Sequence, residues 1–235
     1  MHYSSLLLLS LLPSTLQAVP VFIGTSTGEH TLSKGIYLAD FDMTTGKLSG
    51  LELATPYKSP GFLVQHPTLP VLYTCGAPAK PFSDGSGSVA AFNISKRYSL
   101  TFMDEANTGG NGPTHITVDA TGNTIAVANY GDGSISTISL SKTGSPIGTT
   151  SLVFNEGTGP NKERQNGPHA HGVYFDKANK HLFVPDLGLD KVLIYPFDAA
   201  TSKLGEQLPP LQTAPGAGPR HMTFSSDEKF AYVIN

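Results

Sequence analysis

The sequence has one cysteine, few charged residues and no basic tract among its 235 positions. A single cysteine, Cys75, excludes an intrachain disulfide framework. It lies in the apolar run 71–75 with no basic neighbour in sequence, so we expect an inert core residue. With 14% charged residues and a net charge of −3, the chain lacks the basic surface that nucleic acid requires. Nothing in the composition predicts binding to a membrane surface either.

Long hydrophobic runs are also missing. The apolar stretch from Leu6 to Leu12, broken only by Ser10, is too short to span a bilayer, and Leu16-Gln17-Ala18 after it is suited to cleavage. We therefore expect residues 1–18 to be a signal peptide and residues 19–235 to form a secreted domain. No Lys or Arg precedes the apolar stretch, which leaves a cytoplasmic location as the alternative.

Turn-forming residues are abundant, with 25 Gly and 18 Pro, and helical periodicity is nearly absent. This composition is typical of an all-β protein with many tight connections. Four segments align without gaps and recur about 50 residues apart: 61–66, 114–119, 171–176 and 220–225. Each is followed by a polar turn and a second apolar run: 71–75, 124–128, 181–185 and 230–234.

Further strands are expected from the same repetition. Third strands are predicted at 35–41, 87–94, 133–140 and 190–197, and an outer strand around 150–154. Four short strands in a unit of about 50 residues are the pattern of a β-propeller blade. A β-sandwich with coincidental spacing is the alternative. About four blades fit in the chain, and its last repeat stops after two strands. A ring of seven blades would need roughly 365 residues, so we expect the N-terminal part of a longer propeller.

Polar groups gather at the start of each repeat, which we expect to face the central channel. This position holds Gly61, Thr114, His171 and Arg220, and the next one along carries His115 and His221. Arg164 and His169 lie in and at the end of the loop that leads into the third repeat. Arginine presents two parallel donors to a carboxylate or phosphate, and histidine moves protons near neutral pH. The pattern predicts a site for a small anionic ligand.

Structural interpretations of these histidines stay open. His115 and His221 could simply bind backbone carbonyl groups at the strand start. His169 and His171 have the spacing of a metal pair, but no nearby Cys or carboxylate accompanies them, so we expect no metal.

Several segments together resemble one protein family. They are Ala128-Asn-Tyr-Gly131, Arg164-Gln165, Pro168-His-Ala-His-Gly172, Val184-Pro-Asp-Leu-Gly188 and Gly216-Ala-Gly-Pro-Arg-His-Met222. From about Val21 to Asn235 the chain is similar to the seven-bladed β-propeller lactonases, which include propeller-type 6-phosphogluconolactonases and carboxy-cis,cis-muconate cyclases. The resemblance implies a cofactor-independent active site in the central channel. It places the family's active-site histidine at His171 and an active-site arginine at Arg220, with a glutamate directly after the position of Asn235.

The function that this resemblance implies is hydrolysis of a sugar lactone or phospholactone, such as 6-phosphogluconolactone. His171 and Arg220 would then be catalytic, and Arg164, His169, His115 and His221 would bind the substrate. Ring closure of a carboxymuconate is the alternative, because it also needs an anion held by arginine. A propeller that only binds ligands or proteins is a further alternative, since the fold alone fixes no function. The expected partner is a small anionic lactone or carboxylate, and the full-length protein is expected to be a monomer.

Overall fold

The computed structural model describes residues 18–235, and within them every regular element is a β-strand. The predicted signal peptide therefore lies, apart from Ala18, outside the described residues. In the described part of the chain, no helix has the length and apolar character needed to cross a membrane.

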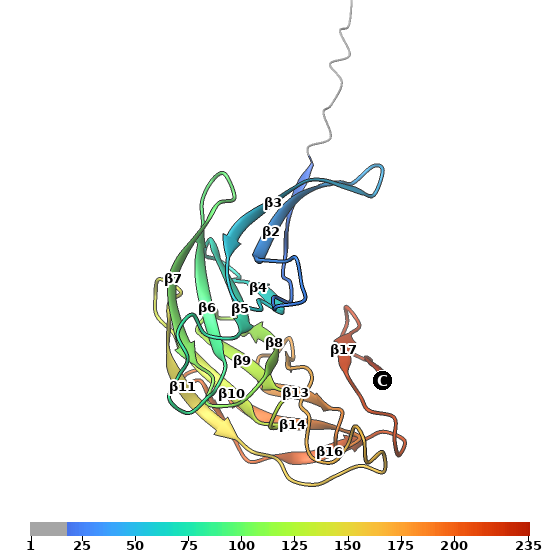
Figure 1. The fold of residues 1–235 in the computed structure, drawn as a ribbon. Helices are drawn as coiled ribbons and strands as arrows, with labels where there is room; N and C mark the ends of the chain where they lie inside the picture. Colours follow the sequence, from blue (N-terminus) through green and yellow to red (C-terminus); the bar gives the residue numbers. More distant parts are fainter. Residues whose placement is uncertain (1–17) are drawn as a thin grey trace, which may run out of the picture.

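Within residues 18–235 the strands form five antiparallel sheets that follow one another in an arc (Figure 1). The first sheet contains β1 (Val19–Ile23), β2 (Gly35–Asp42) and β3 (Lys47–Pro56). The second contains β4 (Phe62–Gln65), β5 (Val71–Gly76), β6 (Ser88–Ile94) and β7 (Leu100–Asn107). The third contains β8 (Pro113–Val118), β9 (Thr124–Asn129), β10 (Ile135–Leu140) and β11 (Pro146–Val153).

The fourth sheet contains β12 (Tyr174–Phe175), β13 (His181–Asp186), β14 (Lys191–Asp198), β15 (Lys203–Leu204) and β16 (Leu208–Gln212). The fifth contains β17 (His221–Phe224) and β18 (Ala231–Ile234). In the second and third sheets, four strands pair in chain order. This arrangement confirms the all-β propeller prediction and its four-stranded repeat. The outer strand expected around 150–154 begins earlier than predicted, at Pro146.

One predicted strand is much shorter than expected. The repeat predicts a strand over 171–176 at the start of the third repeat, but β12 covers only Tyr174–Phe175, and His171 lies before it. The His171 N–H donates to the Pro185 carbonyl oxygen at 2.9 Å, whereas Pro185 has no N–H to donate in return. The strand ladder is interrupted opposite this proline, and a single bridge between Ala170 and Asp186 continues the pairing.

Apolar side chains fill the spaces between neighbouring sheets. One cluster between the second and third sheets includes Tyr73, Val127 and Ile138, all fully buried. A second cluster joins the third sheet to the fourth. Cys75 belongs to the first of these clusters, and burial raises the pKa of its thiol to about 12. The prediction of a core cysteine is therefore confirmed, and the raised pKa keeps the thiol in its unreactive protonated form.

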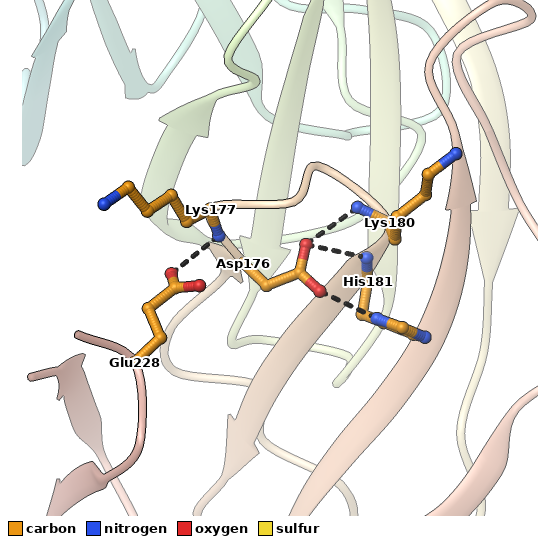
Figure 2. Close-up of polar contacts among 5 residues, drawn as sticks. All are labelled: Asp176, Lys177, Lys180, His181 and Glu228. Atoms are coloured by element: carbon orange, nitrogen blue, oxygen red, sulfur yellow. Dashed lines mark hydrogen bonds and ion pairs between the residues drawn. The ribbon is translucent and has the colours of Figure 1, made fainter.

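The turn after the first strand of each repeat is organised by a side-chain acceptor. The carboxylate of Asp176 accepts hydrogen bonds from the backbone N–H groups of Lys180 (2.7 Å) and His181 (3.2 Å), as Figure 2 shows. Its second oxygen accepts from Nδ1 of His181 at 2.7 Å. Asp119 occupies the equivalent position in the preceding repeat and accepts from the N–H groups of Asn123 and Thr124.

The same turns connect each sheet to the next. Nδ2 of Asn179 donates to Asp119 at 2.9 Å, and Oδ1 of Asn179 accepts from the Ala120 N–H. In the following repeat, Glu228 accepts from the Lys177 N–H at 2.6 Å (Figure 2). Asn179 and Glu228 share a left-handed backbone, with φ of 56° and 54°. The repeated turn thus fixes the angle between sheets, and with it the positions of the inner strands.

Candidate active site

Three histidines from different sheets meet at the inner strands. His115 lies on β8, His221 opens β17, and His171 lies in the segment before β12. The ring centroids of His171 and His221 are 5.0 Å apart, and those of His115 and His221 are 5.8 Å apart. The structure therefore brings together three of the histidines singled out from the repeat positions.

His115 is the most deeply placed of the three, with 4% of its surface exposed. Its ring packs against Phe62 at 4.0 Å and against Tyr174 at 4.8 Å. Its Nδ1 accepts a hydrogen bond from the Val173 N–H at 3.3 Å. Burial, followed by the neighbouring histidines, lowers the pKa of His115 to about 3. These contacts suit a residue that supports the site better than one that touches a ligand.

His171 is buried and neutral at physiological pH. Burial lowers its pKa to about 4, and the nearby charges of Arg220, His221 and Arg164 contribute to the lowering. Its Nδ1 is buried and has no hydrogen-bond partner among residues 18–235. A neutral imidazole has a free ring nitrogen, so His171 can accept a proton from a water molecule.

His221 connects the cluster to the rest of the fold. Its Nδ1 lies 3.1 Å from the hydroxyl oxygen of Tyr174, which holds the ring in place. Burial and the adjacent charge of Arg220 lower the pKa of His221. Tyr174 fills the space left by Gly172, where an added Cβ would lie 2.6 Å from the tyrosine ring.

The two arginines line one pocket of about 290 Å³. Its other lining residues are Asn161, Gln165, Leu187, Gly216, Ala217, Gly218 and Asn235. Both Arg164 and Arg220 have exposed side chains, and the Arg220 N–H donates to the Ile234 carbonyl oxygen at 2.8 Å. Two guanidinium groups that line one small pocket make it suited to binding an anion such as a carboxylate or a phosphate.

Tyr130 joins this pocket to the histidines, and sequence reasoning did not single it out as a site residue. Its hydroxyl accepts from Arg164 at 3.2 Å, and its ring meets His171 edge to face at 5.3 Å. It also stacks on His169 at 4.6 Å, and Nδ1 of His169 donates to the Tyr130 carbonyl oxygen at 2.8 Å. Tyr130 lies in the segment 128–131 that carries the family resemblance, which was the available signal.

Two further residues at the site are not predicted from the sequence. Asn161 lines the pocket of the two arginines, and Tyr174 packs against the ring of His115. Within residues 18–235, no three His, Cys, Asp or Glu side chains are grouped as a metal-ligand set.

Comparison with known proteins identifies the family of this chain. Residues 20–235 match the family described as "Lactonase, 7-bladed beta-propeller". The chain belongs to this lactonase family. It is 33% identical over 215 residues to a 6-phosphogluconolactonase of Bacillus subtilis, covering 91% of this chain and 58% of the relative. It is 29% identical to a 6-phosphogluconolactonase of Formosa agariphila, covering 92% of this chain and 61% of the relative.

Solved structures resemble this lactonase-family chain over most of its described length. The periplasmic gluconolactonase of Pseudomonas aeruginosa superposes with a TM-score of 0.78 at 27% identity. That match covers 91% of this chain and 60% of the Pseudomonas protein. The chain thus spans about three fifths of the length of these relatives.

Proposed function

We propose that this chain carries the active site of a lactonase that hydrolyses a sugar lactone or phospholactone, such as 6-phosphogluconolactone, without a cofactor. One observation carries the proposal: Tyr130 contacts the ring of His171 at 5.3 Å between centroids and accepts a hydrogen bond from Arg164, which lines one pocket with Arg220. The relatives named as 6-phosphogluconolactonases support the choice of substrate.

Lactone hydrolysis needs a proton acceptor for the attacking water. His171 takes a proton from the water while the water oxygen adds to the lactone carbonyl carbon. The resulting tetrahedral intermediate collapses, the bond from the former carbonyl carbon to the ring oxygen breaks, and the ring oxygen receives the proton from His171. The product is the open-chain hydroxy acid. Because the pKa of His171 is about 4, the base form predominates at neutral pH.

The arginines supply the positive charge that an anionic substrate and an oxyanion require. Arg220, the charged neighbour of His171, stabilises the developing oxyanion or holds the substrate anion, and Arg164, which lines the same pocket, binds the phosphate or carboxylate. In this proposal His221, which contacts the ring of His171, and His169, which stacks on Tyr130, contact the sugar. His115, buried behind them, holds the arrangement in place.

Location and assembly belong to the same proposal. We infer that residues 1–18 are removed and that the mature protein acts outside the cytoplasm as a monomer. The Pseudomonas aeruginosa relative is named as a periplasmic protein, which supports an extracytoplasmic role. N-terminal sequencing of secreted protein tests this: a chain that begins near Val19 supports it, and an intact Met1 on cytoplasmic protein overturns it.

Three substrates test the proposed reaction. We expect the wild-type protein to accelerate hydrolysis of 6-phosphogluconolactone, followed as proton release above the spontaneous rate. D-glucono-1,5-lactone should be hydrolysed with a higher KM because it lacks the anion. Cyclisation of carboxymuconate without lactone hydrolysis would identify a cyclase instead. Binding of these compounds with no turnover would identify a propeller that only binds ligands.

A further inference from the structure

A buried carboxylate beneath the pocket connects the two loops that carry the arginines. Asp190 is 3% exposed and accepts three hydrogen bonds from those loops. Nε2 of Gln165 donates to Oδ1 at 2.7 Å, and the Gly218 N–H donates to the same oxygen at 2.8 Å. The Gly216 N–H donates to Oδ2 at 2.6 Å.

Each of these donors lies within four residues of an arginine in the chain. Gln165 follows Arg164 directly, and its Oε1 accepts from the Asn161 N–H at 3.0 Å, which closes the turn around the arginine. Gly218 is two residues before Arg220. The carboxylate of Asp190 is thus the shared acceptor of a loop from each side of the pocket.

The backbone of Asp190 strengthens this connection. Its carbonyl oxygen accepts from the N–H of Thr213 at 2.9 Å and from Nε2 of Gln212 at 3.0 Å. The loop 213–219 is therefore fixed at its start by the Asp190 backbone and further along by the Asp190 side chain. Burial alone would raise the pKa of this carboxyl, but the hydrogen bonds from Gly218, Gly216 and Gln165 outweigh it and lower the pKa.

The conformation of Asp190 indicates that its side chain is needed. Its φ is +55°, a left-handed value that glycine adopts at lower cost. The equivalent residue of the preceding repeat is Gly133, with φ of +70°. The fold of the repeat therefore accommodates glycine at this position, and the fourth sheet has an aspartate where its carboxylate bridges two arginine-bearing loops.

We propose that Asp190 is a positioning residue that sets the separation of Arg164 and Arg220, so that both guanidinium groups can hold one phosphate group. The inference rests on the proposed function only for the identity of the substrate, a phosphorylated sugar lactone. Asp190 itself does not line the pocket and acts through the two loops. Its loss should weaken recognition of the anion and leave the proton-transfer step at His171 intact.

Three variants separate positioning from folding. Asp190→Gly removes the carboxylate and relieves the backbone, Asp190→Ala removes the carboxylate and keeps the strain, and Asp190→Asn keeps one acceptor oxygen. Asp198→Ala is the control, because Asp198 ends the same strand, β14, and its exposed carboxylate accepts from Ala200 and Thr201 of its own turn. We expect the Gly and Ala variants to raise KM for 6-phosphogluconolactone about 10-fold or more, a loss typical of one charge-assisted contact.

For D-glucono-1,5-lactone, which has no phosphate, the same variants should keep KM within about twofold and kcat within about threefold of wild type. Asp190→Asn should fall between wild type and Asp190→Gly, because its amide nitrogen cannot accept from the Gly216 N–H. Asp198→Ala should match wild type. The proposal is overturned if Asp190→Gly keeps the wild-type KM for the phosphorylated lactone, or if both lactones lose affinity equally.

Calorimetric titration with inorganic phosphate keeps this test independent of turnover. If the wild-type protein hydrolyses neither lactone, the proposed function fails, but phosphate affinity still decides the role of Asp190. We expect about 10-fold weaker phosphate binding in the Gly and Ala variants and unchanged binding in Asp198→Ala. Equal phosphate affinity in all the proteins, or no phosphate binding by wild type, contradicts the proposal.

Discussion

The imidazole rings of His171 and His221 lie edge to face with their centroids 5.0 Å apart, and Arg220 immediately precedes His221 in the chain. Burial, followed by the charge of Arg220, disfavours a proton on either ring and lowers both pKa values. Both rings are therefore held as bases at neutral pH, and this property leads to the first prediction.

The acid limb of the pH–rate profile should reflect His171. Because burial and neighbouring charges lower its pKa to about 4, kcat/KM should stay level from about pH 7 to pH 5 and fall below about pH 4. Neutral D-glucono-1,5-lactone is the substrate of choice, because the phosphate of 6-phosphogluconolactone titrates near pH 6 and would obscure the limb. Arg220→Ala removes a charge that lowers the pKa of His171, so it should move the limb to higher pH. His30→Gln, a substitution at an exposed residue, should leave the limb in place. A limb near the ordinary histidine value of 6.5 in wild type would contradict this assignment.

Asp186 should make the free energy of unfolding depend on pH. Its Oδ1 accepts from the N–H groups of His169, Gly188 and Leu189, but burial dominates and raises its pKa from 3.8 to about 6. Native protein then binds more protons than unfolded protein between these values, so this contribution to stability is complete below pH 4 and is lost as pH rises through 6. The size is about 2–3 kcal/mol.

Asp186→Asn should remove this pH dependence. Asn129 occupies the equivalent place in the preceding repeat, so the repeat already accommodates an amide there. Urea unfolding at pH 4, 5, 6 and 7 should give a flatter series for the variant than for wild type. Parallel series for the two proteins would show that Asp186 does not titrate in this range.

Asn179 should contribute to stability through the contact between the third and fourth sheets. Asn179→Ala removes both hydrogen bonds to the turn at Asp119 and places alanine at φ of 56°, so we expect a loss of about 2–3 kcal/mol. Asn179→Gly removes the same hydrogen bonds without the backbone strain and should cost roughly 1 kcal/mol less. Denaturant midpoints measure both variants. If both unfold at the wild-type midpoint, the turn does not hold the sheets together.

Sequence periodicity predicted the repeated part of the fold well. Equivalent positions of a repeat face the same axis, so the sequence alone predicts that His115, His171, His221 and Arg220 lie close together. The late start of β12 at Tyr174 could not be predicted in this way. It depends on Pro185, which lies opposite on the neighbouring strand. Which residue interrupts a ladder depends on the pairing register as well as on local pattern.

The residues that connect the loops of the site could not be predicted from the sequence either. Tyr130 contacts Arg164 across 34 positions, and Asp190 contacts Gln165 and Gly218 across 25 and 28 positions. These contacts join loops of neighbouring sheets, and no spacing rule links residues in different loops. The sequence pattern predicted that Arg164 and Arg220 serve one anion site, but it did not predict the contacts of Tyr130 and Asp190 that connect their loops.

The comparison of Arg220→Lys with wild type on 6-phosphogluconolactone tests the proposed site most directly. Lysine keeps the charge but loses the two parallel donors of the guanidinium, a loss of about 1.5–3 kcal/mol, so kcat/KM should fall roughly 10- to 200-fold. The exposed substitution Arg97→Lys should stay within about twofold of wild type. If Arg220→Lys also stays within about twofold of an active wild-type protein, then Arg220 does not bind the substrate or its oxyanion, and the site lies elsewhere.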